Sequence, residues 1–187
     1  MQAQTAVVSP LSLTARRAIA VVLGAALVAI AAQIAVPLPG TPVPMTLQPL
    51  AVLVVGGLLG AHLGAGSLVL YLALGAAGLP VFTPFGLPGI ARLFGPTGGY
   101  LLAYPIAAYA VGRLAGDGRR WARVALGVLA GLALIHLGGL AQLGILTGSL
   151  RDAARFGTLP FLAGDLVKLG IAVLILRPSV SPLRARL

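Results

Sequence analysis

The stretch "LPFLAGDLVKLGIAVLIL", from Leu159 to Leu176, decides the class of fold. It is apolar and, at about 1.5 Å per residue, long enough to cross a bilayer as a helix. Asp165 and Lys168 interrupt it about 9 Å and about 13 Å from its start and share one helix face. A charge that faces lipid costs at least about 2.5–3.5 kcal/mol, so both residues are expected to face a cavity or a partner. Two interpretations stay open: an internal ion pair that only locks packing, or part of a ligand site.

The composition is that of a membrane protein. Of the 187 residues, 59% are hydrophobic and only 9% are charged, whereas a soluble domain carries about 25% charged residues. We therefore predict a single all-α integral membrane domain over residues 1–187, with the lipid bilayer as its surroundings. The net charge of +10 would suit nucleic acid, but the arginines gather in short loops and tails. That distribution is typical of membrane topology and indicates no nucleic-acid partner.

The apolar blocks leave one ambiguity in the number of spans. Residues 47–79 form either one long helix or two short helices that break near His62. Arg16 and Arg17 precede the first block and further arginines follow the last one, so both termini are expected in the cytoplasm and the number of spans should be even. The other blocks are Ala18–Val36, Gly99–Ala115 with a kink at Pro105, Val124–Leu146 and Leu159–Leu176.

We therefore predict six transmembrane helices and a break near His62. The six-helix core should extend over residues 18–177, between cytoplasmic tails over residues 1–17 and 178–187. The chain should then be a multi-pass protein of the plasma membrane. This arrangement places nine basic residues on the cytoplasmic side and leaves three arginines, one of them Arg92, in outer loops.

The inventory of reactive residues argues against catalysis. Lys168 is the only lysine and is followed by Leu169, so the chain has no G-x-x-x-x-G-K-[ST] loop for ATP. No two carboxylates lie close enough in the sequence pattern to act as an acid–base pair. The lack of cysteine removes thiolate metal sites and disulfides. We expect no enzyme, no metal and no cofactor, and favour binding or transport. The acidic residues are Asp117, Asp152 and Asp165.

The two histidines show no metal-ligand spacing. His62 and His136 belong to different predicted spans. His136 lies in the middle of its span, where it is either a satisfied interior histidine or part of a proton relay. One alternative function is therefore a proton-coupled secondary transporter of a small anionic solute that uses Asp165 and His136. Another is a structural membrane subunit in which Asp165 and Lys168 only lock two helices together.

Two outer loops have an unusual composition. The first, "VPLPGTPVPMTLQPL" (Val36–Leu50), packs prolines and polar side chains together, and proline stiffens a loop because it fixes φ. The second, Gly78–Tyr104, is rich in glycine, proline and aromatic residues and contains Arg92. Non-helical backbone near a membrane is tolerated where protein covers it or where it lines a cavity. The loops are therefore either ordinary connections or walls of a site.

Four segments resemble those of a known family. They are "GTPVPMTLQ" (Gly40–Gln48), "LYLALGAAGLPVF" (Leu70–Phe82), "GPTGGYL" (Gly95–Leu101) and "PFLAGDLVK" (Pro160–Lys168). Their order and spacing are similar to those of BioY, the biotin-specific S component of energy-coupling factor (ECF) transporters. The resemblance implies a six-helix, ECF S-component-like fold that captures biotin from outside. It also implies partners: a transmembrane T component and a pair of cytoplasmic ATPases.

The resemblance further implies residues of the binding site. The D-x-x-K of the family falls on Asp165 and Lys168, and the arginine before "GPTGGY" falls on Arg92. A carboxylate can accept the N–H groups of the biotin ureido ring, an ammonium can donate to the ureido carbonyl, and a guanidinium suits the tail carboxylate. Which cation meets which end of biotin stays open. An asparagine associated with the region before this arginine has no counterpart here, and the loop offers Thr83 instead.

Aromatic and amide side chains complete the expected site. Tyr71, Phe82, Phe85 and Tyr100 are candidates for a wall around the apolar ring of biotin, or for ordinary packing. Gln48, the last residue of the first family-like segment, is assigned to the same site.

The first span carries a candidate docking face. Small residues recur at four-residue spacing, Ala20 with Gly24 and Ala25 with Ala29, and leave a groove that another helix can approach closely. The groove serves either packing within the domain or a partner. The resemblance implies a partner, because S components are expected to dock their T component through an A-x-x-x-A motif on this helix. The best match is "AALVA", Ala25–Ala29.

Overall fold

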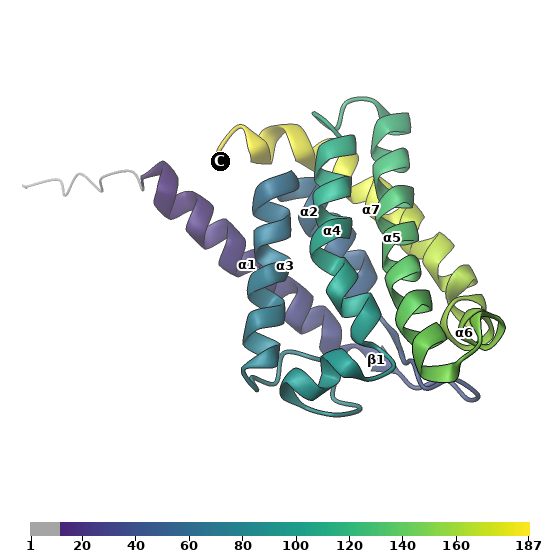
Figure 1. Cartoon of the computed structure of the whole chain (residues 1–187). Coiled ribbons are helices and arrows are strands. Elements are labelled where there is room, and N and C mark those ends of the chain that lie inside the picture. Colours follow the sequence, from purple (N-terminus) through teal and green to yellow (C-terminus); the bar gives the residue numbers. More distant parts are fainter. Residues whose placement is uncertain (1–11) are drawn as a thin grey trace, which may run out of the picture.

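The computed structural model describes residues 12–187, which fold into a bundle of α-helices (Figure 1). This confirms the predicted all-α class. Besides the helices, the described residues contain one antiparallel pair of short strands, β1 (Ala35–Val36) and β2 (Met45–Thr46), and two 3-10 helices, η1 (Gly89–Phe94) and η2 (Leu159–Phe161). The α-helices are α1 (Leu13–Gln33), α2 (Gln48–Leu59), α3 (Ala61–Ala76), α4 (Gly98–Leu114), α5 (Trp121–Thr147), α6 (Leu150–Gly157) and α7 (Leu162–Arg184).

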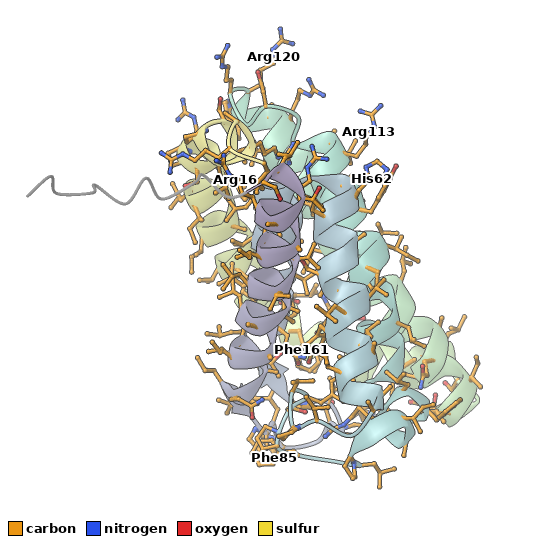
Figure 2. The ribbon with its side chains drawn as sticks, turned by 90° about the vertical axis from the view of Figure 1, so that its left-hand side faces the viewer. Arg16, His62, Phe85, Arg113, Arg120 and Phe161 are labelled. Carbon is orange, nitrogen blue, oxygen red and sulfur yellow. The ribbon has the colours of Figure 1, made fainter. Side chains whose placement is uncertain are left out.

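The two ends of the bundle differ in character. Figure 2 shows Arg16, Arg113 and Arg120 at one end, together with His62, whereas Phe85 lies at the other. The first end, called here the basic end, holds the junction of α2 and α3, the α4–α5 connection and the end of α7. The second, the hairpin end, holds β1, η1 and α6. The basic end is the one that charge bias predicts for the cytoplasm.

The predicted break near His62 is confirmed. It falls at Gly60, which separates α2 from α3 and has φ +83°, in the left-handed region that favours glycine. Near it the helices touch backbone to backbone. A side-chain carbon at Gly56 of α2 would lie 2.4 Å from the carbonyl oxygen of Ala108 in α4, and one at Gly64 of α3 would lie 2.8 Å from the Cα of Gly56. Glycine therefore allows α2 to pack directly against both neighbours.

The number of six spans stays a prediction. Three helical stretches within residues 12–187 are long and apolar enough to cross a bilayer, namely Leu13–Gln33, Trp121–Thr147 and Leu150–Arg184, the last of which joins α6 to α7. Helices α2 and α3 are apolar but shorter, with 12 and 16 residues. α2 is enclosed by its neighbours, since the side chains of Val52 and Leu53 are fully buried. It therefore contributes more to the core of the bundle than to its surface.

The segment over residues 178–187, predicted as a cytoplasmic C-terminal tail, is largely helical. α7 continues to Arg184, and Val180 in this extension is fully buried. The Arg184 guanidinium donates hydrogen bonds to four carbonyl oxygens at or just beyond the ends of α2 and α4, where helices leave carbonyls unpaired. The hydropathy of the sequence falls where the apolar run ends, but packing carries the helix further. The acceptors are Gly57 (2.5 Å), Leu58 (3.4 Å), Gly112 (3.1 Å) and Gly116 (2.7 Å).

The first helix also extends beyond its predicted span. α1 begins at Leu13 rather than Ala18. Ser12 precedes it, and its hydroxyl accepts a hydrogen bond from the backbone nitrogen of Ala15 at 3.2 Å, as an N-cap does. The predicted N-terminal tail is therefore partly helical, and its residues 1–11 lie outside the described residues.

Candidate ligand-binding site

A cavity lies at the hairpin end, between α4, α5, α7 and the loops around β2 and η1. The space inside it, counted together with the open solvent at its mouth, is about 590 Å³. Phe161, one of its apolar lining residues, lies inside the bundle toward Phe85 in Figure 2. The cavity brings together most of the ligand-binding residues predicted from the sequence. Those that line it are Gln48, Phe82, Arg92, Tyr100, Asp165 and Lys168.

Asp165 is the centre of the polar wall. Its Oδ1 accepts a hydrogen bond from Lys168 Nζ at 3.0 Å, and its Oδ2 lies 2.7 Å from His136 Nε2. Asp165 and Lys168 come from successive positions on one face of α7, while His136 reaches them from α5. All three side chains are largely buried. The carboxylate is thus paired within the protein, as a buried charge must be, and both of the predicted charged residues face the cavity rather than lipid.

His136 is a site residue that the sequence analysis did not assign. The structure places its ring in the cavity wall and against Asp165, a contact that both histidine interpretations allow. Its other nitrogen, Nδ1, is buried and has no hydrogen-bond partner among residues 12–187. The signal in the sequence was an ionisable residue in mid-span, which requires a partner. The partner lies 29 residues away on another helix, and nothing in the local pattern names it.

Arg92 is buried where η1 borders the cavity. Its Nε donates to the carbonyl oxygen of Leu87 at 2.7 Å, and its two terminal nitrogens donate to the hydroxyl of Thr83 at 2.9 Å and the carbonyl of Thr83 at 2.8 Å. A further bond goes to the carbonyl oxygen of Phe85. Burial lowers the pKa of the guanidinium, which nevertheless stays protonated. Arg92 thus holds its own loop in shape, and one of its five N–H groups is left uncommitted among these contacts.

Some of the aromatic residues line the cavity, and Tyr71 packs behind them. Tyr100 and Phe82 line the cavity, and the Tyr100 hydroxyl donates to the carbonyl oxygen of Gly157, at the end of α6, at 2.5 Å. Tyr71 does not line it. Its hydroxyl accepts a hydrogen bond from Gln48 Nε2 at 2.6 Å, and its ring meets the edge of Phe82 with centroids 5.4 Å apart. Tyr71 is fully buried behind the cavity wall and supports Gln48 and Phe82, which do line the cavity. A direct part of Tyr71 in binding stays a prediction.

Phe85 also differs from its expected place. It is exposed, borders a second depression next to the cavity, and does not line the cavity itself. Its backbone has a role instead, because its carbonyl oxygen accepts a hydrogen bond from Arg92. An aromatic residue in a glycine- and proline-rich loop gives no sequence signal for the direction of its side chain.

The proline-rich loop between α1 and α2 supplies part of the wall. It is held at its base by the pairing of β1 with β2, and the Thr41 hydroxyl donates to the carbonyl oxygen of Phe156 in α6 at 2.6 Å. The loop therefore lines the cavity, and its part in a ligand site stays a prediction. The lining residues from this loop and the start of α2 are Val43, Pro44, Thr46, Gln48 and Pro49. The other lining residues that the sequence analysis did not assign to the site are Thr97, Leu101, Tyr104, Leu132, Ile135 and Phe161.

The small residues of α1 divide between the inside and the surface. Gly24 and Ala25 are buried, and a side-chain carbon at Gly24 would lie 2.5 Å from the hydroxyl oxygen of Ser67 in α3. Ala20 and Ala29 are half-buried. Gly24 and Ala25 therefore serve packing within the domain, one of the two uses that the sequence left open. Docking of a partner on this helix stays a prediction.

The fold and the cavity define a class: a helical membrane protein that encloses a small-molecule site with one buried carboxylate and several cationic or hydrogen-bonding partners. The comparison with known families then places it. The family model described as "BioY family" matches residues 2–185, and the chain belongs to this family.

Individual relatives agree with this placement. The chain is 44% identical over 155 residues to a protein of Pyrococcus horikoshii named "Probable biotin transporter BioY", which covers 83% of this chain and 90% of the relative. It is 39% identical over 150 residues to "Biotin transporter BioY" of Thermotoga maritima, over 80% of this chain and 87% of that one. Among solved structures it is similar to the "S-component for biotin from an ECF-type ABC transporter", with a TM-score of 0.80 and 27% sequence identity. The match covers 90% of this chain and 94% of the solved one.

Proposed function

We propose that this chain captures biotin in the cavity at the hairpin end and acts as the substrate-binding membrane subunit of an ECF-type transporter. The observation that carries the proposal is the buried group of Asp165, Lys168 and His136, which faces a cavity at the hairpin end. It is supported by the solved S component for biotin, whose fold this chain shares. A role in binding rather than catalysis follows from the same family membership.

The chemistry of the wall suits the ureido ring of biotin. Each oxygen of a carboxylate can accept more than one hydrogen bond, so Asp165 can accept from ureido N–H groups while it keeps Lys168 and His136. Lys168 has further N–H donors for the ureido carbonyl, and Asp165 balances its charge. The apolar side of the biotin ring would lie against Phe82 and Tyr100, which form the nonpolar part of the wall.

The other end of biotin is assigned to Arg92. Most of its donors hold the loop, so a ligand carboxylate would meet the guanidinium through its remaining N–H and its charge. This makes the contact weaker than the bidentate pair that the residue type alone suggests. Lys168 remains the stronger candidate for the ureido end, because it shares the inner wall with Asp165.

Binding to the purified chain tests this function. Isothermal titration of the protein in detergent should show saturable heat with biotin and a markedly weaker response with an analogue in which the ureido carbonyl is replaced. A folded protein without heat or thermal stabilisation at millimolar biotin would reject the proposal and favour the alternative of a structural subunit.

A proton-coupled secondary transporter remains the second candidate, because His136 and Asp165 are in hydrogen-bond contact at 2.7 Å. The two functions make opposite demands on a reconstituted system. Proteoliposomes that contain this chain alone should accumulate biotin under a proton gradient if it is a secondary transporter. If it is an ECF subunit, accumulation should require the T component, the ATPase pair and ATP.

We further propose that the T component docks on α1. Ala20 and Ala29 are half-buried, and large apolar side chains between them are exposed, which leaves a face for another helix. Ala29→Leu should weaken assembly with the T component and leave biotin affinity unchanged. Ala25→Leu should destabilise the domain itself, because Ala25 is buried. Intact assembly in a folded Ala29→Leu variant would place the docking face elsewhere.

The orientation in the membrane is part of the same proposal. Six spans, with both termini and the basic end in the cytoplasm of a plasma-membrane protein, follow from the distribution of arginines. Cysteines introduced at Arg120, an exposed residue at the basic end, and at Arg151, in α6, should react with an impermeant reagent from opposite sides. Reaction of both from one side would reject the six-span topology.

A further inference from the structure

A second crevice lies at the basic end, remote from the ligand cavity. It forms where the start of α5 and the loop before it face the last turns of α7. It shares no lining residue with the ligand cavity. The residues that line it are Arg119, Trp121, Val173, Leu174, Arg177 and Pro178.

The crevice carries two guanidinium groups with little opposing charge. Arg177 is exposed and has no hydrogen bond or ion pair with any other residue in the described range 12–187. Arg119 lies 3.9 Å from the carboxylate of Asp117, but both side chains are well exposed to water, which screens the contact. Two guanidinium groups that share one crevice suit a phosphate, which guanidinium binds in a bidentate manner.

The remaining lining residues are apolar. The Trp121 side chain is 64% exposed, and tryptophan is enriched at membrane–water interfaces. Leu174 is 76% exposed and lies three residues before Arg177, so the two share a face of α7. The crevice thus combines positive charge, an amphipathic ring and an aliphatic surface, which match the chemistry of a phospholipid's phosphate, glycerol region and acyl chain.

We propose that this crevice is a binding site for an anionic phospholipid, with the phosphate between Arg119 and Arg177 and an acyl chain along Val173 and Leu174. Basic pockets between membrane helices are a known means of holding anionic headgroups. A small soluble anion would explain the arginines but leave the exposed apolar wall without a role. A helix from a partner protein would cover that wall, but it would have to bring acidic groups for both arginines.

The test compares charge in the crevice with charge elsewhere at the same end. The double variant Arg119→Gln/Arg177→Gln removes both guanidinium groups, and the control is Arg113→Gln with Arg120→Gln, which removes two exposed arginines that do not line the crevice. Each purified protein is titrated with phosphatidylglycerol and with phosphatidylcholine in mixed micelles, and native mass spectrometry counts the lipids that stay bound. Glycerol 3-phosphate, which lacks acyl chains, serves as the soluble probe.

The wild-type protein should retain phosphatidylglycerol in preference to phosphatidylcholine, and the crevice variant should lose about fivefold in affinity per arginine. The control should change less than twofold, and biotin binding should be the same in all proteins, so this proposal can fail while the proposed function stands. Equal losses in crevice and control variants would show a diffuse surface charge and overturn the proposal. Glycerol 3-phosphate binding as tightly as the lipid would overturn it too. The same holds if the crevice variant keeps its lipid but no longer assembles with the T component.

Discussion

Two arginines, one at each end of the bundle, use the same chemistry for different purposes. At the hairpin end, Arg92 donates to acceptors that are only 5 to 9 residues away in the chain. At the basic end, Arg184 donates to acceptors that are 68 to 127 residues away. The first guanidinium shapes a loop that borders the ligand cavity, and the second joins the ends of two helices to a third. Sequence separation, rather than burial or charge, distinguishes a residue that shapes the site from one that holds the bundle.

The comparison predicts that changes to the charged residues of the hairpin end alter affinity, whereas the change of Arg184 at the basic end alters stability alone. The largest effect is expected for Asp165→Asn. This variant keeps the shape of the side chain but leaves Lys168 without a countercharge, and breaking a buried pair costs about 3–5 kcal/mol of stability. Biotin affinity should fall by at least a hundredfold in titration calorimetry of the folded fraction. Asp117→Asn, the same change at an exposed carboxylate, is the control. Native affinity in a folded Asp165→Asn variant would remove Asp165 from the binding site.

The next effect is expected for Arg184→Gln. Glutamine cannot reach all four carbonyl oxygens, and hydrogen bonds to a charged group contribute about 1.5–3 kcal/mol. Thermal unfolding in detergent should therefore occur at a lower temperature, whereas Arg186→Gln, at an exposed arginine two residues further on, should leave it unchanged. Biotin affinity should be native in both. A loss of affinity that parallels the loss of stability would show that the two ends are coupled.

A smaller change is expected for Arg92, and a pair of variants separates its two roles. Arg92→Ala removes the charge and the loop contacts, while Arg92→Lys keeps the charge but cannot replace the planar set of donors. Arg92→Ala should weaken biotin about tenfold, equivalent to about 1.4 kcal/mol, and should weaken an analogue without the tail carboxylate less. Arg92→Lys should recover part of the lost affinity for biotin, because it keeps the charge. If Arg92→Ala lowers the affinity for biotin and for the analogue by the same factor, the arginine acts through the loop alone.

The smallest effect is expected for Tyr100→Phe. The change keeps the ring in the wall and removes only the hydrogen bond to the carbonyl oxygen of Gly157. An unpaired buried carbonyl costs about 1–3 kcal/mol, so unfolding should shift downward by a few degrees while biotin affinity stays within about twofold. A large loss of affinity would mean that the hydroxyl itself contacts the ligand.

Local features of this fold were predictable from the sequence. The pairing of Asp165 with Lys168 follows from a spacing of three residues on one helix, and charge bias placed the helix break within two residues of Gly60. The proline-rich loop could be predicted as a candidate cavity wall, because irregular backbone near a membrane is tolerated where protein covers it or where it lines a cavity.

Long-range contacts were not predictable, for a physical reason. The partner of His136 depends on how α5 and α7 pack, and the acceptors of Arg184 depend on how α2 and α4 end. Neither relation leaves a periodic signal in a single chain. The predicted end of α7 was too early because the apolar run that the prediction follows ends at Leu176. The helix continues because Val180 is buried against the loop at Gly118, a contact that hydropathy does not reveal. The directions of the Tyr71 and Phe85 side chains could not be predicted either, because they also depend on packing between distant segments.

The backbone contact of Gly56 with Ala108 has a mechanical consequence. No side chain separates α2 from α4 at this point. The two helices therefore cannot move closer together there without a collision of main-chain atoms. α4 and the start of α2 are also two of the walls of the cavity. This part of the cavity wall therefore has little room to move, whereas the proline-rich loop and the Arg92 loop, which also line the cavity, have no such backbone contact with α4 through Gly56.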